Sequence, residues 1–280
     1  MNAMSRLDDE QAKRWNGPAG QAWVDLQGVL DRLFEPFEDL LVEAVSASRG
    51  ERVLDVGCGT GSTTLAVARQ PNAPRRCVGI DVSEPMIAAA RARAEREGSS
   101  ATFIHGNAQN HVLERAGFDV VISRFGVMFF ADAVAAFSNL RHATTSDGWL
   151  HVIAWRSAAE NPFMTTAERA AAPLLPNLPA RRSDSPGQFA FADPARVNAV
   201  LAESGWSEID LRPIDVPCVM AKKDLIPYLS RLGPVGAALQ GTKDPTRENI
   251  VETVAAAFEP YVHGAEVRFT AACWMVRARA

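Results

Sequence analysis

Apolar residues recur along the central part of the chain in two alternating patterns. Short, mainly apolar runs, typical of buried strands, occupy residues 52–56, 77–80, 102–104, 118–123 and 149–155. The segments between most of these runs carry apolar residues at helical spacing. Strands that alternate with helices of this length predict an α/β fold built on a doubly wound parallel sheet.

Polar residues mark where several of the expected helices begin and end. Ser83 and Asp132 stand where N-caps are expected, and Gly98 is placed to end the helix that Ser83 begins. Residues 26–48 also have helical spacing. Pro36 lies inside that segment, so we expect it to divide the segment into two helices, with the proline in the first turn of the second.

The alternation changes after residue 155. Residues 157–191 are rich in proline and alanine and are too long for a simple connection, as is typical of a lid or binding loop. A helix over 193–201 and a strand over 207–216 are expected next. A mainly helical insertion over 222–264 and a terminal strand over 267–277 complete the pattern.

Composition and charge narrow the class of protein. Hydrophobic residues make up 47% of the 280 residues and charged residues 22%, which suits a globular core. The 29 basic and 33 acidic residues leave a net charge of -4, so we expect no nucleic-acid partner. The four cysteines are widely spaced and form no metal-binding pair, and no segment has the pattern of a signal peptide or membrane span. These features predict a cytoplasmic protein without a metal site.

The most informative motif is the segment Val53-Leu54-Asp55-Val56-Gly57-Cys58-Gly59-Thr60-Gly61. A strand there leads into a turn with glycines at alternate positions, where the backbone can turn sharply and a ligand can approach it closely. A dinucleotide-binding G-x-G-x-x-G motif that begins at Gly57 needs its third glycine at position 62, which is Ser62. The alternatives are therefore a nucleoside-binding loop of another kind and a tight turn without a ligand.

An acidic residue ends the second expected strand. Asp81 lies 20 residues beyond Gly61, where a carboxylate can accept hydrogen bonds from both hydroxyls of a ribose. The alternative is an acid that is merely solvated at the start of a helix. Ser83 already supplies the cap of that helix, which favours the ribose role.

These motifs together resemble a known family. The region from Glu51 to Trp155, with its D-x-G-x-G-x-G loop, looks like the core of the class I S-adenosylmethionine-dependent methyltransferases. It resembles most the bacterial small-molecule enzymes related to ubiquinone and menaquinone biosynthesis. The segment Trp15-Asn16-Gly17-Pro18 and the terminal strand resemble a broad bacterial group of such enzymes. The resemblance implies S-adenosylmethionine as cofactor and a Rossmann-like seven-stranded sheet of order 3-2-1-4-5-7-6, its last strand antiparallel, with helical lid insertions.

The resemblance also divides the chain and implies a binding site. The expected parts are an N-terminal helical segment or lid (1–50), the nucleoside-binding core (51–156), the lid insertion (157–191), and the rest of the sheet with its helical insertion (192–280). The residues expected to bind the cofactor are Asp55, Gly57, Cys58, Gly59, Gly61, Asp81, Val82, Met86, Asn107, Ala108, Gln109, Ser123 and Arg124. The residues expected to line the acceptor pocket are Trp15, Trp23, Phe125, Met128 and Phe129.

One position departs from the family pattern. The loop after the third strand commonly carries an acid that reads the adenine edge, and Asn107 stands there instead. Its amide oxygen can still accept a hydrogen bond, although a neutral acceptor binds more weakly than a carboxylate.

The expected reaction is in-line transfer of a methyl group to a small organic acceptor. Such a displacement depends mainly on alignment of the reacting atoms, so a general base is optional and no catalytic residue is assigned. Two alternatives stay open: a methyltransferase-like protein that binds the ligand without catalysis, and a nicotinamide-dependent oxidoreductase. The glycine spacing and the absence of a Tyr-x-x-x-Lys pair disfavour the oxidoreductase. The sequence leaves the acceptor and the oligomeric state undetermined.

Overall fold

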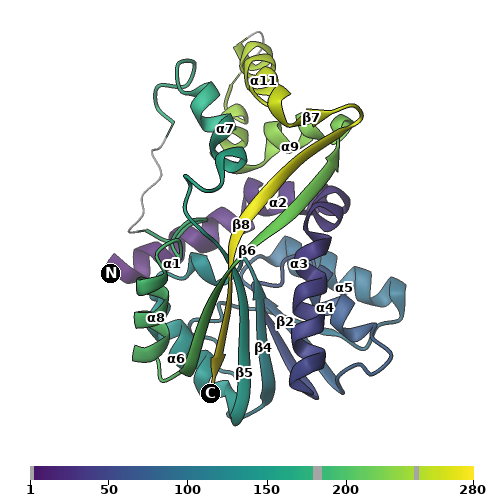
Figure 1. Cartoon of the computed structure of the whole chain (residues 1–280), viewed down its shortest axis with the longest axis vertical. Helices are drawn as coiled ribbons and strands as arrows, with labels where there is room; N and C mark the ends of the chain where they lie inside the picture. Colours follow the sequence, from purple (N-terminus) through teal and green to yellow (C-terminus); the bar gives the residue numbers. More distant parts are fainter. Residues whose placement is uncertain (1–2, 179–184, 243–245) are drawn as a thin grey trace.

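All strands of the described residues belong to one sheet. The computed structural model describes residues 3–178, 185–242 and 246–280 (Figure 1). The sheet has the order β3-β2-β1-β4-β5-β8-β6, and the short β7 pairs with β8. The strands are β1 Arg52–Val56, β2 Arg76–Asp81, β3 Thr102–His105, β4 Phe118–Arg124, β5 Thr144–Trp155, β6 Ser207–Ala221, β7 Val262–His263 and β8 Glu266–Arg279. The expected fold is confirmed, because β8 lies antiparallel between β5 and β6.

Helices cover both faces of the parallel part of the sheet. The helices α3 Gln27–Ser48, α4 Ser62–Ala68 and α5 Glu84–Glu97 pack on one face, and α6 Ala133–Ala143 and α8 Pro194–Glu203 pack on the other (Figure 1). The predicted caps are confirmed: Ser83 and Asp132 accept hydrogen bonds from the first turns of α5 and α6, and Gly98 ends α5 in a left-handed conformation. The carboxyl ends of β1, β2, β3 and β4 consequently meet at one edge of the sheet, as in other parallel sheets.

The expected division at Pro36 is wrong, because α3 continues through this residue as a single helix of 22 residues. A proline in a helix interior removes one backbone hydrogen bond and costs roughly 3 kcal/mol. The apolar face of α3 continues on both sides of Pro36 and is buried at Leu30, Leu33, Phe34, Phe37, Leu41 and Val45. Burial of a large apolar side chain stabilises by roughly 1.5–3 kcal/mol, so packing on both sides of Pro36 outweighs the lost bond.

Two groups of helices lie beyond the ends of the strands. The helices α1 Ala3–Asn16 and α2 Pro18–Asp25 lie beside the carboxyl edge of the parallel strands. A cap, formed by α7 Pro162–Ala171, α9 Leu225–Arg231, α10 Gly233–Leu239 and α11 Thr246–Ala257, stands above them with β7 (Figure 1). Arg231 forms an ion pair with Asp25 at 2.7 Å, which joins the cap to α2.

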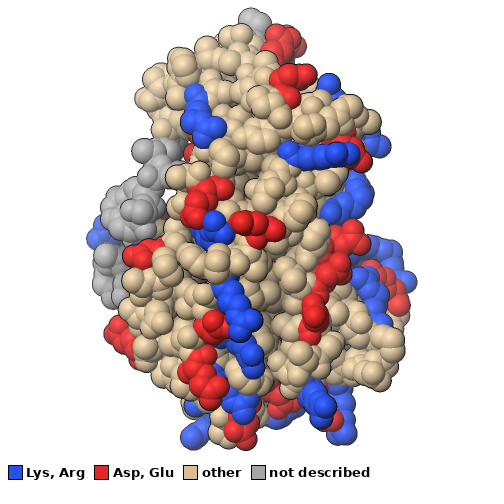
Figure 2. Space-filling view, in the orientation of Figure 1, with Lys and Arg blue, Asp and Glu red and all other residues tan. Residues whose placement is uncertain are grey.

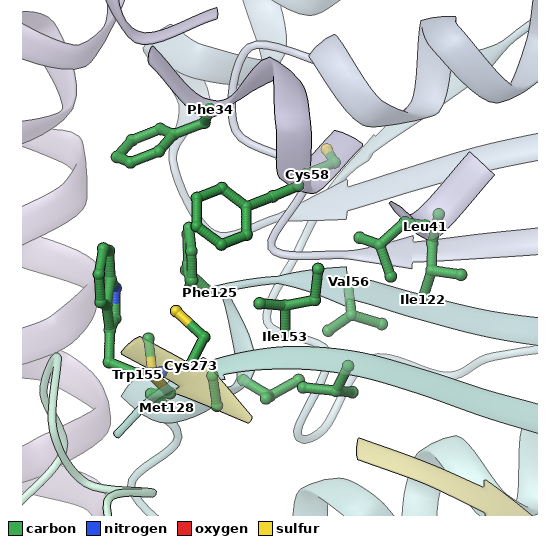
Figure 3. Close-up of a cluster of buried hydrophobic side chains, with 14 of the residues drawn as sticks. Phe34, Leu41, Val56, Cys58, Ile122, Phe125, Met128, Ile153, Trp155 and Cys273 are labelled. Carbon is green, nitrogen blue, oxygen red and sulfur yellow. The ribbon is translucent and has the colours of Figure 1, made fainter. Parts of the chain in front are cut away.

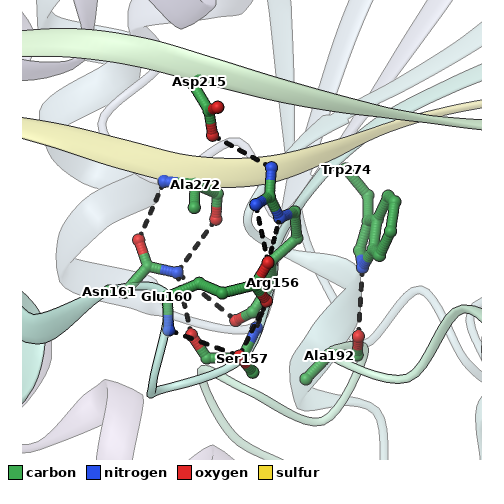
Figure 4. A network of polar contacts seen from close by, with 8 residues as sticks. All are labelled: Arg156, Ser157, Glu160, Asn161, Ala192, Asp215, Ala272 and Trp274. Atoms are coloured by element: carbon green, nitrogen blue, oxygen red, sulfur yellow. Dashed lines mark hydrogen bonds and ion pairs between the residues drawn. The ribbon is translucent and has the colours of Figure 1, made fainter.

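Polar contacts fix both ends of the segment that leads into the cap (Figure 4). The buried Asn161 donates to the carbonyl of Ala272 and accepts from its N–H, both at 2.9 Å. The indole N–H of Trp274 donates to the carbonyl of Ala192 at 3.1 Å. Arg156 adds ion pairs with the two acidic side chains of the same figure. The region expected as a lid is therefore attached to β8 at its start and just beyond its end.

Two strands are longer than the sequence pattern predicts. β5 begins at Thr144 instead of residue 149, and β6 continues to Ala221 instead of residue 216. β6 pairs with β8 up to the pair Ala221–Glu266, so this pair of antiparallel strands extends from the sheet into the cap. The exposed positions and prolines of β6 hide its length in the sequence. Residues 1–2, 179–184 and 243–245, which belong to the expected N-terminal segment and the two expected insertions, lie outside the described residues.

Candidate active site

The loop after β1 and the loop after β4 touch through their backbones. Gly57 has a φ of +67°, and a Cβ placed on it would lie 2.6 Å from the Cα of Gly126. The hydroxyl of Ser123 donates to the carbonyl of Val56 at 2.7 Å and accepts from the N–H of Gly126 at 3.2 Å. Ser123, expected to bind the cofactor directly, therefore has its hydroxyl engaged in holding the two loops together.

Asp81 is joined to the glycine loop. Its carboxylate accepts hydrogen bonds from the backbone N–H groups of Gly59 at 2.9 Å and Ser83 at 2.8 Å. The residue is only 9% exposed. Burial raises the pKa of Asp81, while the hydrogen bonds from Ser83 and Gly59 oppose that shift. The acid at the end of β2 is thus held beside the loop, in the position where a ribose would meet both.

The glycine loop leaves room for a ligand at Gly59. A Cβ placed there would meet only the sulfur of Met86, at 3.6 Å, which is an ordinary contact. The neighbouring Cys58 is buried, and burial raises the pKa of its thiol well above the usual value. Cys58 is consequently a neutral side chain, and its own backbone N–H and carbonyl are hydrogen-bonded to Ile80 and Gly61. These residues and the carboxylate of Asp81 fit a nucleoside whose ribose lies against the loop.

Asp55 supports the loop from below. Its carboxylate is buried and accepts a hydrogen bond from the hydroxyl of Thr64 in α4 at 2.6 Å. Burial raises the pKa of Asp55 to about 6, although the bond from Thr64 and the charge of Arg124 lower it. The side chain is turned toward α4, so Asp55 shapes the loop between β1 and α4.

A buried cluster of charges lies at the other end of the loop. The guanidinium of Arg124 lies 3.9 Å from the carboxylate of Glu38, and it donates to the carbonyl of Phe34 at 3.4 Å. Ser62, at the start of α4, donates a hydrogen bond to Glu38. Burial raises the pKa of Glu38. Sequence reasoning missed Glu38, because an acid within an amphipathic helix carries no local signal of its partner.

Helix α1 contacts the loop that follows β3, which we call the third-strand loop. Asn107 donates to the carboxylate of Asp8 at 3.4 Å, and Gln109 donates to the other oxygen of the same carboxylate at 2.9 Å. The amide oxygen of Asn107 accepts from the backbone N–H of Gln109 at 3.0 Å. Ala108 between them is buried. No local pattern in the sequence indicates that Asp8 meets this loop.

The junction of α1 and α2 is fastened to the end of β2. Asn16 donates to the carbonyl of Val82 at 2.9 Å and accepts from the N–H of Glu84 at 2.8 Å. The hydroxyl of Ser83 donates to the carbonyl of Trp15 at 2.6 Å. These bonds place Trp15 directly beside the residues expected to bind the cofactor.

Aromatic rings extend from this junction toward the sheet. Trp15 contacts Phe129 edge-on at a centroid distance of 5.2 Å and Trp23 at 6.3 Å. Trp23 stacks with Phe34 at 6.4 Å, and Phe34 contacts Phe125 at 5.5 Å. We call these five residues the aromatic wall. Three of the five residues, Trp15, Trp23 and Phe129, are partly exposed.

Two of the expected pocket residues lie deeper than the sequence suggested (Figure 3). Met128 is 1% exposed, and its sulfur accepts from the N–H of Trp155, so it belongs to the core. Phe125 is buried and stacks on Trp155 at 4.6 Å. Its φ of +65° is unusual for an aromatic residue and costs roughly 1–2 kcal/mol. Strain of this kind is often found at functional sites.

Known proteins share both the sequence pattern and the fold. Residues 53–148 match the model of a methyltransferase domain. A demethylmenaquinone methyltransferase of Thermus thermophilus is 30% identical over 166 residues, which cover 56% of this chain and 74% of the relative. An uncharacterised protein of Mycobacterium tuberculosis is 29% identical over 173 residues, which cover 62% of this chain and 60% of the relative.

A solved structure has the same architecture. The magnesium protoporphyrin IX methyltransferase of Synechocystis, solved with S-adenosylhomocysteine, matches with a TM-score of 0.59 at 16% identity, over 98% of this chain and 100% of that chain. At this identity the likeness shows the fold alone. The domain match and the Thermus relative show that the chain belongs to the class I S-adenosylmethionine-dependent methyltransferases. The predicted family and cofactor class are thereby confirmed.

Two further features concern metals and membranes. Among residues 3–178, 185–242 and 246–280, no group of three His, Cys, Asp or Glu side chains is arranged to hold a metal ion. Within the same ranges, no helix has the length and apolar character needed to span a membrane.

Proposed function

We propose that this protein transfers the methyl group of S-adenosylmethionine to a small, planar organic acceptor. The observation that carries the proposal is the aromatic wall, which lies beside Asp81 and the glycine loop. Planar rings pack well against aromatic side chains, and an apolar enclosure suits a small molecule better than a polymer chain.

The residues of the chain have separable parts in this reaction. S-adenosylmethionine supplies a methyl group on a positively charged sulfur. Asp81 and the loop at Gly59 hold the nucleoside, and the wall holds the acceptor and excludes water. Fixed orientation of the reactants can lower the barrier by roughly 7–11 kcal/mol, so positioning is the main contribution expected of the protein.

The wall also limits the chemistry of the acceptor. The guanidinium of Arg14 lies 5.3 Å from the ring of Trp15 and 5.9 Å from that of Phe129. A nearby cation favours an anionic acceptor. Acidic phenols, hydroxyquinones and enols fit this condition.

The surface charge supports an acceptor other than a nucleic acid, and the cysteines support a cytoplasmic location. Basic and acidic side chains are interspersed on the face in Figure 2, which offers no continuous basic surface to a nucleic acid. All four cysteines are buried free thiols. Free thiols are typical of a reducing compartment, which favours the cytoplasm.

Transfer of an isotope-labelled methyl group to a panel of small acceptors tests the proposal. We expect labelled products from acidic phenols, hydroxyquinones or enols, and none from proteins or nucleic acids. Trp23→Ala should lower kcat/KM for such an acceptor at least about tenfold, because a ring of the wall is lost. Its affinity for S-adenosylhomocysteine should stay within about threefold.

Trp149→Ala is the matched control, because Trp149 lies at the opposite edge of the sheet, near the chain terminus at Arg279. It should leave both the acceptor kinetics and the cofactor affinity unchanged. Methylation of proteins or nucleic acids alone would contradict the small-molecule proposal. Cofactor binding without transfer to any acceptor would favour a binding protein instead.

A further inference from the structure

The third-strand loop and helix α1 meet at a single carboxylate. The carboxylate of Asp8 accepts hydrogen bonds from the side-chain amides of Asn107 and Gln109, which lie 99 and 101 residues away along the chain. These are two residues of the loop in which the family usually carries an acid. The loop itself has no acid at that position, and α1 brings one to the same place.

The geometry leaves Asn107 poorly suited to replace that acid. Its amide oxygen accepts from the backbone N–H of Gln109, and its amide nitrogen points to Asp8. The acceptor group of Asn107 is therefore used within the loop. The loop offers a ligand mainly donors, whereas Asp8 offers a charged acceptor beside them.

The supporting contacts hold Asp8 in place from two sides. Gln109 is fixed at its other end, because its amide oxygen accepts from the backbone N–H of Asp132 at 2.9 Å. The C-terminal end of α1 is fastened to β2 through Trp15 and Asn16. Asp8 is half-buried at this place. Its carboxylate is thus presented by a helix whose C-terminal end is anchored to β2.

Asp8 lies on the side of the site where an adenine would be expected. Asp81, where the ribose is expected, pairs in the sheet with His105 at the end of β3. Asn107 follows two residues later, so the base attached to that ribose would lie toward the third-strand loop. The 6-amino group of adenine is a hydrogen-bond donor and its N1 is an acceptor. A carboxylate is complementary to the 6-amino group at that edge.

We propose that Asp8 accepts a hydrogen bond from the 6-amino group of the adenine of the methyl donor, in place of the acid missing at position 107. The side-chain amide groups of Asn107 and Gln109 donate to the carboxylate and hold it in place. The inference rests on the proposed function of the site as a donor-binding site. It makes α1 part of the specificity of that site as well as its cover.

A comparison of two ligands with two proteins tests the inference. S-adenosylhomocysteine and its analogue without the 6-amino group are titrated calorimetrically into the full chain and into Asp8→Ala. We expect the unaltered protein to bind the adenosyl compound about 10- to 150-fold more tightly than the analogue, as for a hydrogen bond to a charged group. Asp8→Ala should bind the two ligands within about threefold of each other.

Asp9→Ala is the matched control, because it removes the same charge from the neighbouring, exposed residue. It should keep the full preference for the adenosyl compound. Asp8→Asn should keep a part of it, since a neutral amide oxygen still accepts a hydrogen bond. Circular dichroism verifies that each variant keeps its helices.

Two results would overturn the inference. If Asp8→Ala weakens the binding of both ligands equally, Asp8 only holds α1 in place and does not contact the adenine. If Asp8→Ala retains the preference for the amino group, another residue reads it. Failure of the unaltered protein to bind either ligand would instead remove the donor site itself, and with it the proposed function.

Discussion

The carboxylate of Asp81 accepts a hydrogen bond from the backbone N–H of Gly59 at 2.9 Å. This bond joins the end of β2 to the loop after β1, and it fixes the acid beside the backbone that a nucleoside would approach. The geometry of the site is therefore built into the protein, because neither the loop nor the acid needs to move to meet the other.

Asp81→Ala should weaken binding of S-adenosylhomocysteine about 10- to 150-fold, because charged hydrogen bonds to the ribose are lost. The free energy of unfolding should also fall by about 1–3 kcal/mol, since the N–H groups of Gly59 and Ser83 lose their partner. Calorimetry and urea denaturation measure the two effects. Glu84→Ala, at an exposed neighbouring position, should change neither. Unchanged binding by folded Asp81→Ala would remove Asp81 from the site.

Gly57→Ala should destabilise the protein more than Gly98→Ala. Both glycines have a positive φ, +67° and +61°, so both substitutions carry a backbone cost of roughly 1–2 kcal/mol. Only the new Cβ at position 57 meets backbone, at 2.6 Å, while nothing lies within 4 Å of the one at position 98. We expect an additional loss of about 1–3 kcal/mol for Gly57→Ala in urea denaturation. Equal losses would mean that the two loops are not in close contact.

Asn161→Ala should lower the free energy of unfolding by about 1–3 kcal/mol. The buried amide bonds both backbone groups of Ala272, but the carbonyl also accepts from the N–H of Arg156, so the substitution leaves the Ala272 N–H without its partner, at a cost of roughly 1–3 kcal/mol. Asn198→Ala is the control, because Asn198 is exposed on α8, and it should change stability by less than about 0.5 kcal/mol. A similar small change for both variants would show that the contact to β8 does not stabilise the fold.

The free energy of unfolding should depend on pH through the buried His151. The Nε2 atom of its ring lies 2.8 Å from the hydroxyl of Ser48. Burial, with the charge of Arg277, lowers the pKa of His151 from 6.5 to about 4. Between these values the unfolded chain binds a proton that the folded chain does not. Stability is therefore lost as the pH falls from 6.5 to 4, by up to about 3 kcal/mol.

Asp55 acts in the opposite direction, because its folded pKa of about 6 lies above its usual 3.8. The folded chain binds the proton first, so Asp55 favours folding as the pH falls from 6 to 4. The two effects offset each other in the unaltered protein. Urea denaturation from pH 7 to 4 should show that His151→Gln gains stability in acid relative to the unaltered chain and that Asp55→Asn loses it. Parallel pH curves for all three proteins would contradict both assignments.

The resemblance to the family implied the strand order. Local patterns in the sequence were enough to predict the alternation of strands and helices, the caps at Ser83 and Asp132, and the placement of Asp81 after the glycine loop. Each of these depends on residues within a few positions of one another, or on strand and helix periodicity. The lengths of β5 and β6 were underestimated, since the extra residues of β5 are mainly polar and those of β6 begin with Pro217. Pro36 misled the prediction because its local cost is outweighed by the buried face of α3.

The sequence by itself thus determined the fold class, the family and the candidate nucleoside-binding loop, because short-range spacing encodes them. Only the tertiary structure decided which distant residues complete the site. Asp8 meets Asn107 across 99 positions, Glu38 meets Arg124 inside the fold, and Trp23 joins the aromatic wall. The sequence of a single helix shows which of its faces is apolar, but it does not show which strand or loop that face will contact. That partner is set by the packing of the whole chain, where burial and hydrogen bonding are satisfied together.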